Sequence, residues 1–557
     1  MRPVLHRAAL GIACLSALVV AGCGRRVAPN APITWAPADT PYLFANFKGT
    51  PEDVTKAWAG DAMVSARIQQ FGRLADAFGQ NDPTVVAVLN AIQDELANVH
   101  SGKELAQATG FSQSALYAIY GVGDVPVARI ELASPDTFNA FWARVEKRSG
   151  ITMPTASLDN QAYRVIGGAN GKLRFLVAVE DKQLVMTIAP ASASPAMLKQ
   201  LLGLAKPASN AADKLARIDS QHDYSDYGSG FLDLPRLFAN LYDGKDAVTQ
   251  EFARNLGGSL ANPACAGEFA SLASQAPLIS GGMHAYTATQ IRASLDVQLS
   301  SPLLGAMTAL KQPVSGMDEK PDKSMFDMVL ALPLQKWQAF IKGRAEAAAQ
   351  KTYQCPALQS LNDFAKTAAN PPVQMPPEAA FMLGFRVVLD KWDVGPQITG
   401  RALLASSDPV ELAQKIQQTL PQFALKTIPT DGKPVAFDLP PRLQAMLGGG
   451  SQGWIAANAN ALAMGAGDGE DSGTAAMLTA PAGNGDALMR VHFDGRMYQV
   501  LGSWIGRLAA TGPSANQTQV QEQVAMFNQM GKLVGSADVE VKLDDKGLHV
   551  ESDVKHR

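Results

Sequence analysis

The amino-acid sequence predicts an α+β protein built from two similar tandem halves, each an antiparallel sheet of hairpins covered by helices. Three observations predict this class. Short apolar runs come in pairs around turns rich in Gly, Asp and Asn, apolar residues at helical spacing follow several pairs, and the same order of elements occurs twice along the 557 residues. Paired strands followed by a helix favour antiparallel sheets with helices over them.

The first repeated unit is a hairpin followed by a helix. Residues 115–132 form two apolar runs around a Gly-rich turn, and a Ser-Pro pair then opens a segment with apolar residues at helical spacing. Residues 381–404 again form two apolar runs around a turn, and an Asp-Pro pair opens the next amphipathic segment. We therefore match these two units.

Further segments repeat in the same order. The matching segments, first copy then second, are 173–188 with 454–464, 231–233 with 492–494, and 290–299 with 538–554. The alternative is that any α+β chain contains loosely similar strand-strand-helix units. The preserved order favours a duplication, because unrelated units would not keep one sequence of elements.

The matches set the predicted domain organisation. The two α+β halves span residues 42–301 and 325–557. The intervening residues 302–324 are predicted to be a linker, because they include a polar stretch with Pro313 and Gly316, both of which favour turns.

Composition excludes several classes of protein. With 47% hydrophobic and 18% charged residues, the chain is neither mainly disordered nor collagen-like. A formal net charge of -3 lacks the positive field that nonspecific binding to DNA or RNA needs, so no nucleic-acid partner is expected. After the first residues, no segment contains 18 uninterrupted apolar residues, and a second membrane crossing is not predicted.

The first residues have the pattern of an export signal. Arg2 and Arg7 precede the uncharged residues 8–21, and small residues lead to Cys23. This pattern resembles the lipobox of bacterial lipoproteins, although Val20 stands where that family usually has Leu. An ordinary secretory signal or an N-terminal anchor helix are the alternatives.

The lipoprotein resemblance implies a location. Residues 1–22 would be the signal peptide, and Cys23 would be the lipidated residue that carries palmitate or similar chains in the membrane. In that family an Asp after the cysteine retains the protein in the inner membrane, whereas this chain has Gly24. The resemblance therefore implies anchoring at the outer membrane, facing the periplasm.

Residues 23–41 contain four prolines and little apolar periodicity, which predicts an extended lipid-anchored tether. The segment from Pro37 to Tyr42 is similar to the start of large envelope lipoproteins of unknown function. That second resemblance implies location and no activity.

The cysteines predict one disulfide. Cys14 leaves with the signal peptide and Cys23 is taken by lipid, so only Cys265 and Cys355 remain. In an oxidising compartment two remaining cysteines usually pair. Two buried free thiols are the alternative.

Three motifs suggest catalysis or nucleotide binding, and each fails in its context. Ser451 lies in a G-x-S-x-G pattern, but the predicted helix precedes the serine and the strand follows it. The Gly-rich residues 121–126 open a strand, where dinucleotide binding would need a helix. Residues 166–172 lack the Ser or Thr of a phosphate loop and contain Asn170-Gly171, a common hairpin turn. No catalytic residue and no cofactor are therefore predicted.

The remaining polar candidates are His222, Asp226 and Ser229, which could serve a hydrolase or hold a metal. The alternative is a polar loop before a strand. The seven histidines show no zinc-binding spacing, and the acidic residues 468–473 lack the spacing of a calcium loop. No metal site is predicted.

Three functions follow as hypotheses. The first is a noncatalytic, membrane-tethered module that binds or scaffolds an envelope protein. The second is a carrier of an apolar ligand, and the third is a hydrolase that uses His222, Asp226 and Ser229. A tunnel in the structure would favour the carrier, an apolar surface patch the scaffold, and converging polar side chains the enzyme.

Overall fold

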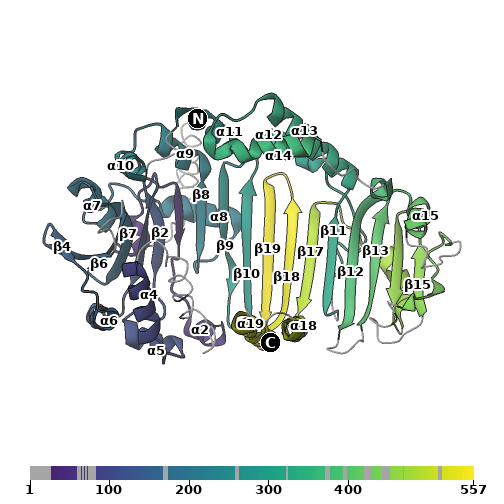
Figure 1. Ribbon diagram of the computed structural model, residues 1–557, viewed down its shortest axis with the longest axis horizontal. Coiled ribbons are helices and arrows are strands. Elements are labelled where there is room, and N and C mark those ends of the chain that lie inside the picture. Colours follow the sequence, from purple (N-terminus) through teal and green to yellow (C-terminus); the bar gives the residue numbers. More distant parts are fainter. Residues whose placement is uncertain are drawn as a thin grey trace, which may run out of the picture.

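The structure is a computed structural model. It describes residues 27–58, 83–166, 173–256, 262–320, 324–370, 377–392, 398–419, 428–441, 452–467, 469–511 and 517–557, together with Val64, Ile68, Gly72 and Gln444. The described residues form nineteen strands in one sheet, with helices on both of its sides, which confirms the predicted α+β class. Figure 1 shows the sheet running through the whole molecule.

Ten strands belong to the first half of the chain. They are β1 (Tyr42–Ala45), β2 (Tyr117–Val122), β3 (Val125–Glu131), β4 (Thr155–Leu158), β5 (Gln161–Ile166), β6 (Leu173–Glu180), β7 (Gln183–Pro190), β8 (Ser229–Asp233), β9 (Leu278–Tyr286) and β10 (Gln290–Gln298). In space they follow the order β4-β5-β6-β7-β3-β2-β1-β8-β9-β10, and every pair is antiparallel.

Nine described strands belong to the second half. They are β11 (Phe326–Ala331), β12 (Met382–Trp392), β13 (Ile398–Ser406), β14 (Val435–Asp438), β15 (Gln452–Ala457), β16 (Ala461–Ala466), β17 (Ala487–Asp494), β18 (Val534–Leu543) and β19 (Gly547–His556). Their order is β14-β15-β16-β13-β12-β11-β17-β18-β19, again antiparallel throughout.

The two orders correspond strand by strand. Inward from β5 and β14, each half continues with a hairpin (β6–β7 and β15–β16), a second hairpin (β3–β2 and β13–β12) and a single strand (β1 and β11). Three further strands complete each half, β8 to β10 in the first and β17 to β19 in the second. The prediction of two similar tandem halves is therefore confirmed. The halves meet where β10 pairs with β19, antiparallel over nine residue pairs from Gln290↔Lys555 to Gln298↔Gly547. We call this pairing the seam.

The helices occupy matching places between the strands. In the first half they are α2 (Glu52–Trp58), α4 (Pro83–Glu95), α5 (Gly102–Thr109), α6 (Pro135–Ser149), α7 (Pro195–Leu202), α8 (Ala212–His222), α9 (Leu234–Tyr242), α10 (Ala247–Leu256), α11 (Pro263–Ala273) and α12 (Ser301–Thr308). In the second half they are α13 (Leu334–Gln350), α14 (Gln359–Ala369), α15 (Pro409–Thr419), α17 (Glu470–Thr479), α18 (Gly495–Thr511) and α19 (Gln517–Leu533). No helix within the described residues is long and apolar enough to span a bilayer.

Local sequence signals explain the repeated unit. Gly123, with a φ of 55°, and Asp124 form the two-residue turn between β2 and β3, so residues 121–126 make a hairpin and no nucleotide loop. Ser134 caps α6 by accepting a hydrogen bond from the Thr137 backbone N–H, and Gly150 ends that helix in the left-handed conformation.

We distinguish the two faces of the sheet. Face A carries Leu295 and Val550, and face B carries Asp296 and His549, because successive side chains of a strand alternate. On face B, helices cover a core in each half, centred on residues such as Phe231 in the first and Leu403 in the second. On face A, α4 and α6 cover the outer strands of the first half, and α15 covers those of the second.

Two segments predicted to be irregular are packed. Residues 23–41 were expected to form a tether, but Ala31, Ile33 and Ala36 are buried in the face-B core of the first half, around a 3-10 helix. Within the expected linker, Val314 and Met317 are buried in the core of the second half. The described parts of these segments, residues 27–41 and 302–320, therefore belong to the folded protein, because their few apolar side chains are buried at positions that sequence periodicity does not reveal.

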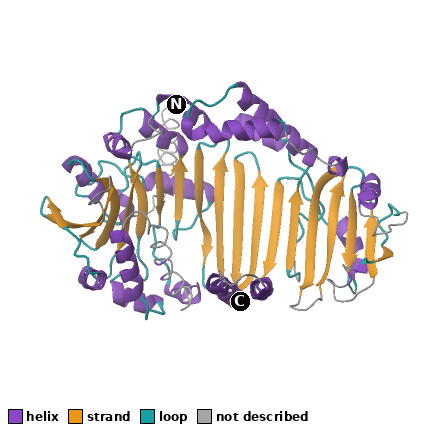
Figure 2. Cartoon of the chain, in the orientation of Figure 1, coloured by secondary structure: helices purple, strands orange, loops and turns teal. Residues whose placement is uncertain are grey.

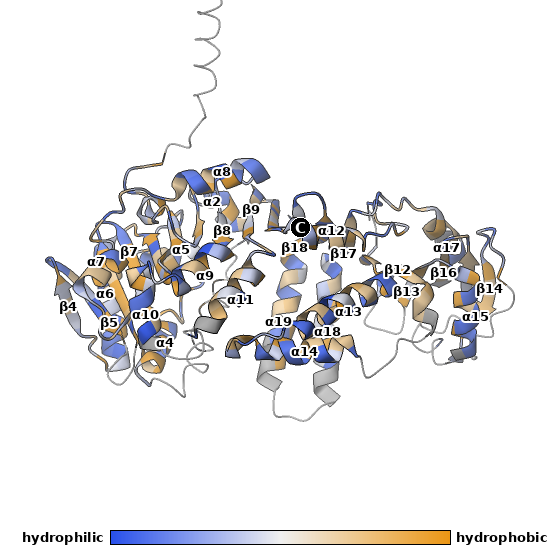
Figure 3. Ribbon diagram, turned by 90° about the horizontal axis from the view of Figure 1, so that it is seen from above, coloured by the Kyte–Doolittle hydropathy of each residue, from blue (hydrophilic) through white to orange (hydrophobic). Residues whose placement is uncertain are grey.

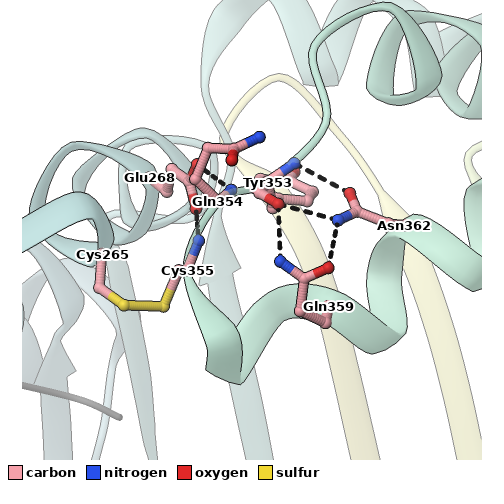
Figure 4. Close-up of a disulfide and its surroundings, with 7 residues drawn as sticks. All are labelled: Cys265, Glu268, Tyr353, Gln354, Cys355, Gln359 and Asn362. Atoms are coloured by element: carbon pink, nitrogen blue, oxygen red, sulfur yellow. Dashed lines mark hydrogen bonds between the residues drawn. A yellow bond between two sulfur atoms is a disulfide. The ribbon is translucent and has the colours of Figure 1, made fainter. Parts of the chain in front are cut away.

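The predicted disulfide is present. Cys265 in α11 is bonded to Cys355, which directly precedes a short 3-10 helix and α14, and both residues are fully buried. Glu268 accepts hydrogen bonds from the backbone N–H groups of Gln354 (2.6 Å) and Cys355 (2.9 Å), as Figure 4 shows. The bond joins the helices after β8 to the helices after β11, across the seam.

Candidate functional site

The candidate site is an apolar row that crosses the sheet on face A. Each member is the Cα partner of the next member on the neighbouring strand. From β2 to β13 the row is Ile119, Phe44, Gly230, Gly281, Leu295, Val550, Val541, Met489, Leu330, Phe385 and Leu404. The residues of this row therefore come from both halves, and some neighbours in the row are hundreds of residues apart in the chain.

The rows beside it are also uncharged. From β10 to β12, the face-A positions are Ile291, Ala293, Leu295, Val297, Leu548, Val550, Ser552, Val554, Ala537, Val539, Val541, Leu543, Met489, Val491, Phe493, Phe326, Met328, Leu330, Phe385, Val387 and Leu389. The hydroxyl of Ser552 is the one polar side-chain group in this set. The whole central region of face A therefore presents hydrocarbon.

This hydrocarbon is incompletely covered. Leu295 is 47% exposed, Phe44 47% and Ile119 42%, and the row from Val550 to Phe385 is half-buried. On face B of the same central strands, Val329 and Val388 are no more than 1% exposed. Figure 2 shows that no helix passes in front of β10, β19, β18 and β17, between the helices at their two ends. A contiguous apolar surface of this kind marks an interaction site.

Two glycines shape the row near the seam. Gly230 and Gly281 lie between Phe44 and Leu295, and a methyl group on Gly230 would overlap the ring of Phe44. A methyl group on Gly281 would meet Leu295 Cδ1 at 3.5 Å. The side chains of Phe44 and Leu295 therefore lie over the backbone of the two glycines, so the surface of face A is closer to the backbone here than on neighbouring strands.

Helices frame this surface at both ends of the strands. In Figure 3, α11, α13, α14, α18 and α19 lie on one side of the sheet and α8 on the other. The helix pair α13 and α14 exposes Ile341 (40%), Leu361 (38%) and Phe364 (64%), and the pair α18 and α19 exposes Trp504 (45%) and Met526 (53%). The helices that border this surface therefore also expose apolar side chains.

Face B at the seam carries a polar network around Asp296. Its carboxylate accepts hydrogen bonds from the Tyr224 hydroxyl, from Ser294 Oγ (2.8 Å) and from His549 Nδ1. His549 Nε2 lies 2.9 Å from the carboxylate of Asp544. Both ring nitrogens of His549 therefore face carboxylates, which accept hydrogen bonds only, so His549 is held as the imidazolium.

The pKa values of this network follow from the same contacts. Burial opposes ionisation of Asp296, but the hydrogen bonds from Tyr224, His549 and Ser294 outweigh it and hold the pKa of this carboxyl below its ordinary value. Burial likewise opposes protonation of His549, and its bonds to Asp296 and Asp544 raise the pKa of the imidazole above the ordinary value. The network is a compensated charge cluster.

The structure separates the three residues proposed for a hydrolase. His222 Nδ1 is 3.4 Å from Asp296, and its ring stacks on Tyr224. Asp226 pairs with Lys48 at 2.8 Å, and the Ser229 hydroxyl is buried with no hydrogen-bond partner in the described part of the chain. The hydrogen bonds and ion pairs of the described residues therefore join neither His222 nor Asp226 to Ser229.

A different serine lies next to a histidine. Ser294 Oγ is 2.9 Å from His284 Nε2, and His284 Nδ1 is 3.2 Å from the backbone oxygen of Asp223. Ser294 Oγ also donates to Asp296 at 2.8 Å, so its single proton is directed at a carboxylate. No sequence motif indicates this pair, because the two residues come together only through strand pairing.

A second charge cluster lies on face B of the second half. Asp327, which is fully buried, accepts two hydrogen bonds from Arg386 (3.0 and 2.9 Å) and one from Arg490 (2.9 Å). Arg386 also donates to Glu319 at 2.5 Å. These groups neutralise one another beneath the 314–319 loop, and they stabilise the fold.

A pocket of about 610 Å³ lies on face B of the first half, between the N-terminal segment and the β6–β7 turn. Arg129 borders this pocket, donates to Glu180 at 2.5 Å and stacks over the Trp35 ring at 3.9 Å. Its Nε and Nη1 atoms are buried and have no partner among the described residues. Because solvent does not reach these two atoms, a ligand in the pocket would not reach them either.

Several predicted positions lie outside the described residues. They are Cys23, the Asn170-Gly171 turn, Ser451 and Asp468. Within the described residues, no three His, Cys, Asp or Glu side chains are arranged to hold a metal ion.

Comparisons with known proteins do not show a family for this chain. No protein-family profile and no curated protein matches the chain. Two solved structures are similar over 51% of the chain, crystal forms I and III of TP0453, at 12% and 11% sequence identity. The matches cover 88% and 87% of those chains, each with a TM-score of 0.24, which is too low to support an argument.

Proposed function

We propose that this chain is a noncatalytic, lipid-anchored binding protein of the bacterial cell envelope, and that the central region of face A is its binding surface. The observation that carries the proposal is the incompletely covered apolar row from Phe44 to Phe385, which spans both halves. The same sheet is covered on face A at its outer strands and on face B in both halves, so the exposure is local.

The hydrophobic effect supports a binding role for this surface. Covering apolar area gains about 25 cal/mol per Å², and monomers rarely leave contiguous apolar patches beyond a few hundred Å². The polar networks on face B are compensated internally and require no ligand. Anchoring through Cys23 rests on the lipobox-like sequence, and the outer membrane is the location we propose.

A probe-binding experiment tests the surface. A fluorescent apolar dye such as N-phenylnaphthylamine should bind the purified full chain, and Leu295→Asp should weaken binding about tenfold or more, since a carboxylate disfavours apolar contact. The matched control is Gln298→Asp, which places the same charge on the same strand at an exposed position of face B. Equal affinity of both variants for the dye would refute face A as the binding surface.

A further inference from the structure

We propose that the occupant of face A is the hydrocarbon chains of individual lipid molecules, held between the helix pairs at the two ends of the strands. This inference rests on the proposed binding role of face A and adds the chemical class of the ligand. It follows from three features: the chemistry of the surface, the helices that border it, and the side of the sheet from which the chain enters.

The surface is large enough for a protein partner but lacks the polar groups that one would use. Eight strands from β8 to β12, with about 4.8 Å between neighbours and about three outward residues each, give a footprint of about 800 Å². A protein interface of about that area per partner usually carries one hydrogen bond per 100–200 Å² or so. Between β10 and β12, face A offers the Ser552 hydroxyl alone. Alkyl chains need no hydrogen bonds.

The bordering helices exclude a flat occupant. α18 and α19 have 17 residues each, which makes them about 25 Å long. Figure 3 shows this pair projecting away from the sheet on the side where α13 and α14 also lie. Sheets and helices pack at about 10 Å, so neither a bilayer surface nor a second copy of the sheet can approach face A past these helices. Single molecules can enter between them.

The chain enters the fold from the opposite side. Ala31, Ile33 and Ala36 are buried against the face-B core, and only eight residues run from Cys23 to Asn30. A fully extended chain of that length reaches about 27 Å, so an anchor at Cys23 holds face B toward its membrane. Face A then points away from that bilayer, and a lipid bound there has left it.

A lipid-transfer experiment tests the inference. The full-length Cys23→Ala chain, which brings no acyl chains of its own, is incubated with vesicles of phosphatidylethanolamine and phosphatidylglycerol. After the vesicles are pelleted, lipid in the protein fraction is measured by mass spectrometry. We expect about one or two lipids per protein molecule. The Gln298→Asp variant should bind the same amount of lipid, and Leu295→Asp should bind at least tenfold less. A second face-A variant, Val541→Asp, should behave like Leu295→Asp, and near-ultraviolet circular dichroism checks that each variant is folded.

Each other outcome overturns the inference in a recognisable way. Protein that pellets with the vesicles without removing lipid indicates docking to the bilayer. Dimers that Leu295→Asp abolishes in sedimentation velocity indicate a second copy on face A. Dye binding that depends on Leu295, with no lipid recovered, leaves the binding surface in place and rejects lipid as its occupant. If Leu295→Asp does not weaken dye binding, the proposed function itself is rejected.

Discussion

Leu295 and Val550 face each other across the seam on face A, and one residue further along each strand Asp296 and His549 face each other on face B. The two pairs share a backbone and differ in what surrounds them. The carboxylate of Asp296 has its hydrogen bonds made within the protein, whereas Leu295 remains 47% exposed. A surface with satisfied polar groups gains little from a partner, and an uncovered apolar surface gains from being covered.

The largest effect should separate the anchor from the binding surface. Replacing Cys23 by Ala should move the protein almost entirely from the detergent phase to the aqueous phase in Triton X-114 partitioning, because the proposed anchor is the two or three acyl chains on this residue. Dye binding on face A should stay unchanged, since the chain enters from face B. Equal partitioning of wild type and variant would contradict the lipoprotein assignment.

The next effect compares neighbouring residues on β11. Asp327→Asn leaves Arg386 and Arg490 buried without their shared carboxylate, and we expect a loss of about 3–5 kcal/mol in the free energy of unfolding. Met328→Asn, one residue along on half-buried face A, should cost about 1 kcal/mol. Urea denaturation measures both, and similar losses for the two variants would mean that the faces do not differ as described.

A third comparison concerns the disulfide that ties α14 to α11. Replacing both Cys265 and Cys355 by Ala should lower the free energy of unfolding by about 2–4 kcal/mol, because the bond closes a loop of 90 residues. A reducing agent should destabilise the wild type by a similar amount and leave the double variant unchanged. Nonreducing peptide mapping should find the two cysteine peptides linked, and free thiols at both positions in freshly alkylated protein would contradict the bond.

The features that the sequence predicts are those with local signals. The Gly123-Asp124 turn, the Ser134 cap and the repeated hairpin-helix order are each contained within a few tens of residues, and together they predict the α+β class and the duplicated halves. The disulfide follows by elimination, since the predicted export signal and lipidation would account for the other two cysteines.

The binding surface could not be predicted in that way. Leu295 reaches Val550 through a pairing of strands 255 positions apart, and the same pairing brings His549 to Asp296 at a separation of 253. Local periodicity reports which residues share a face of one strand but not which strands are neighbours. The packed positions Ile33 and Met317 were missed for a related reason, because single apolar residues in Pro-rich segments carry no periodic signal.

The smallest effect tests whether face B responds to pH while face A does not. The groups that face His549 are Asp296 on β10, Asp544 at the β18–β19 turn and Lys542, its Cα partner on β18. The two carboxylates raise the pKa of His549. Its contribution to the free energy of unfolding is therefore fully present below the ordinary histidine pKa of about 6.5 and is lost as pH rises through the raised value.

The carboxylates set the acid limit of the same window. The pKa values of Asp296 and Asp544 are lowered despite burial, by hydrogen bonds that include those from His549, so their contribution is present above the ordinary aspartate range and is lost as pH falls through the lowered values. The network should therefore be most stabilising near pH 5–6. Above pH 6, deprotonation of His549 removes one charge-assisted hydrogen bond, and we expect the free energy of unfolding to fall by about 1 kcal/mol or more.

Urea denaturation of wild type and His549→Gln at pH 6 and pH 8.5 measures this change. The wild type should lose stability between the two pH values, and the variant, which cannot titrate at this position, should lose less. Dye binding on face A should be equal at the two pH values, and a parallel loss there would show that the two faces of the seam are coupled.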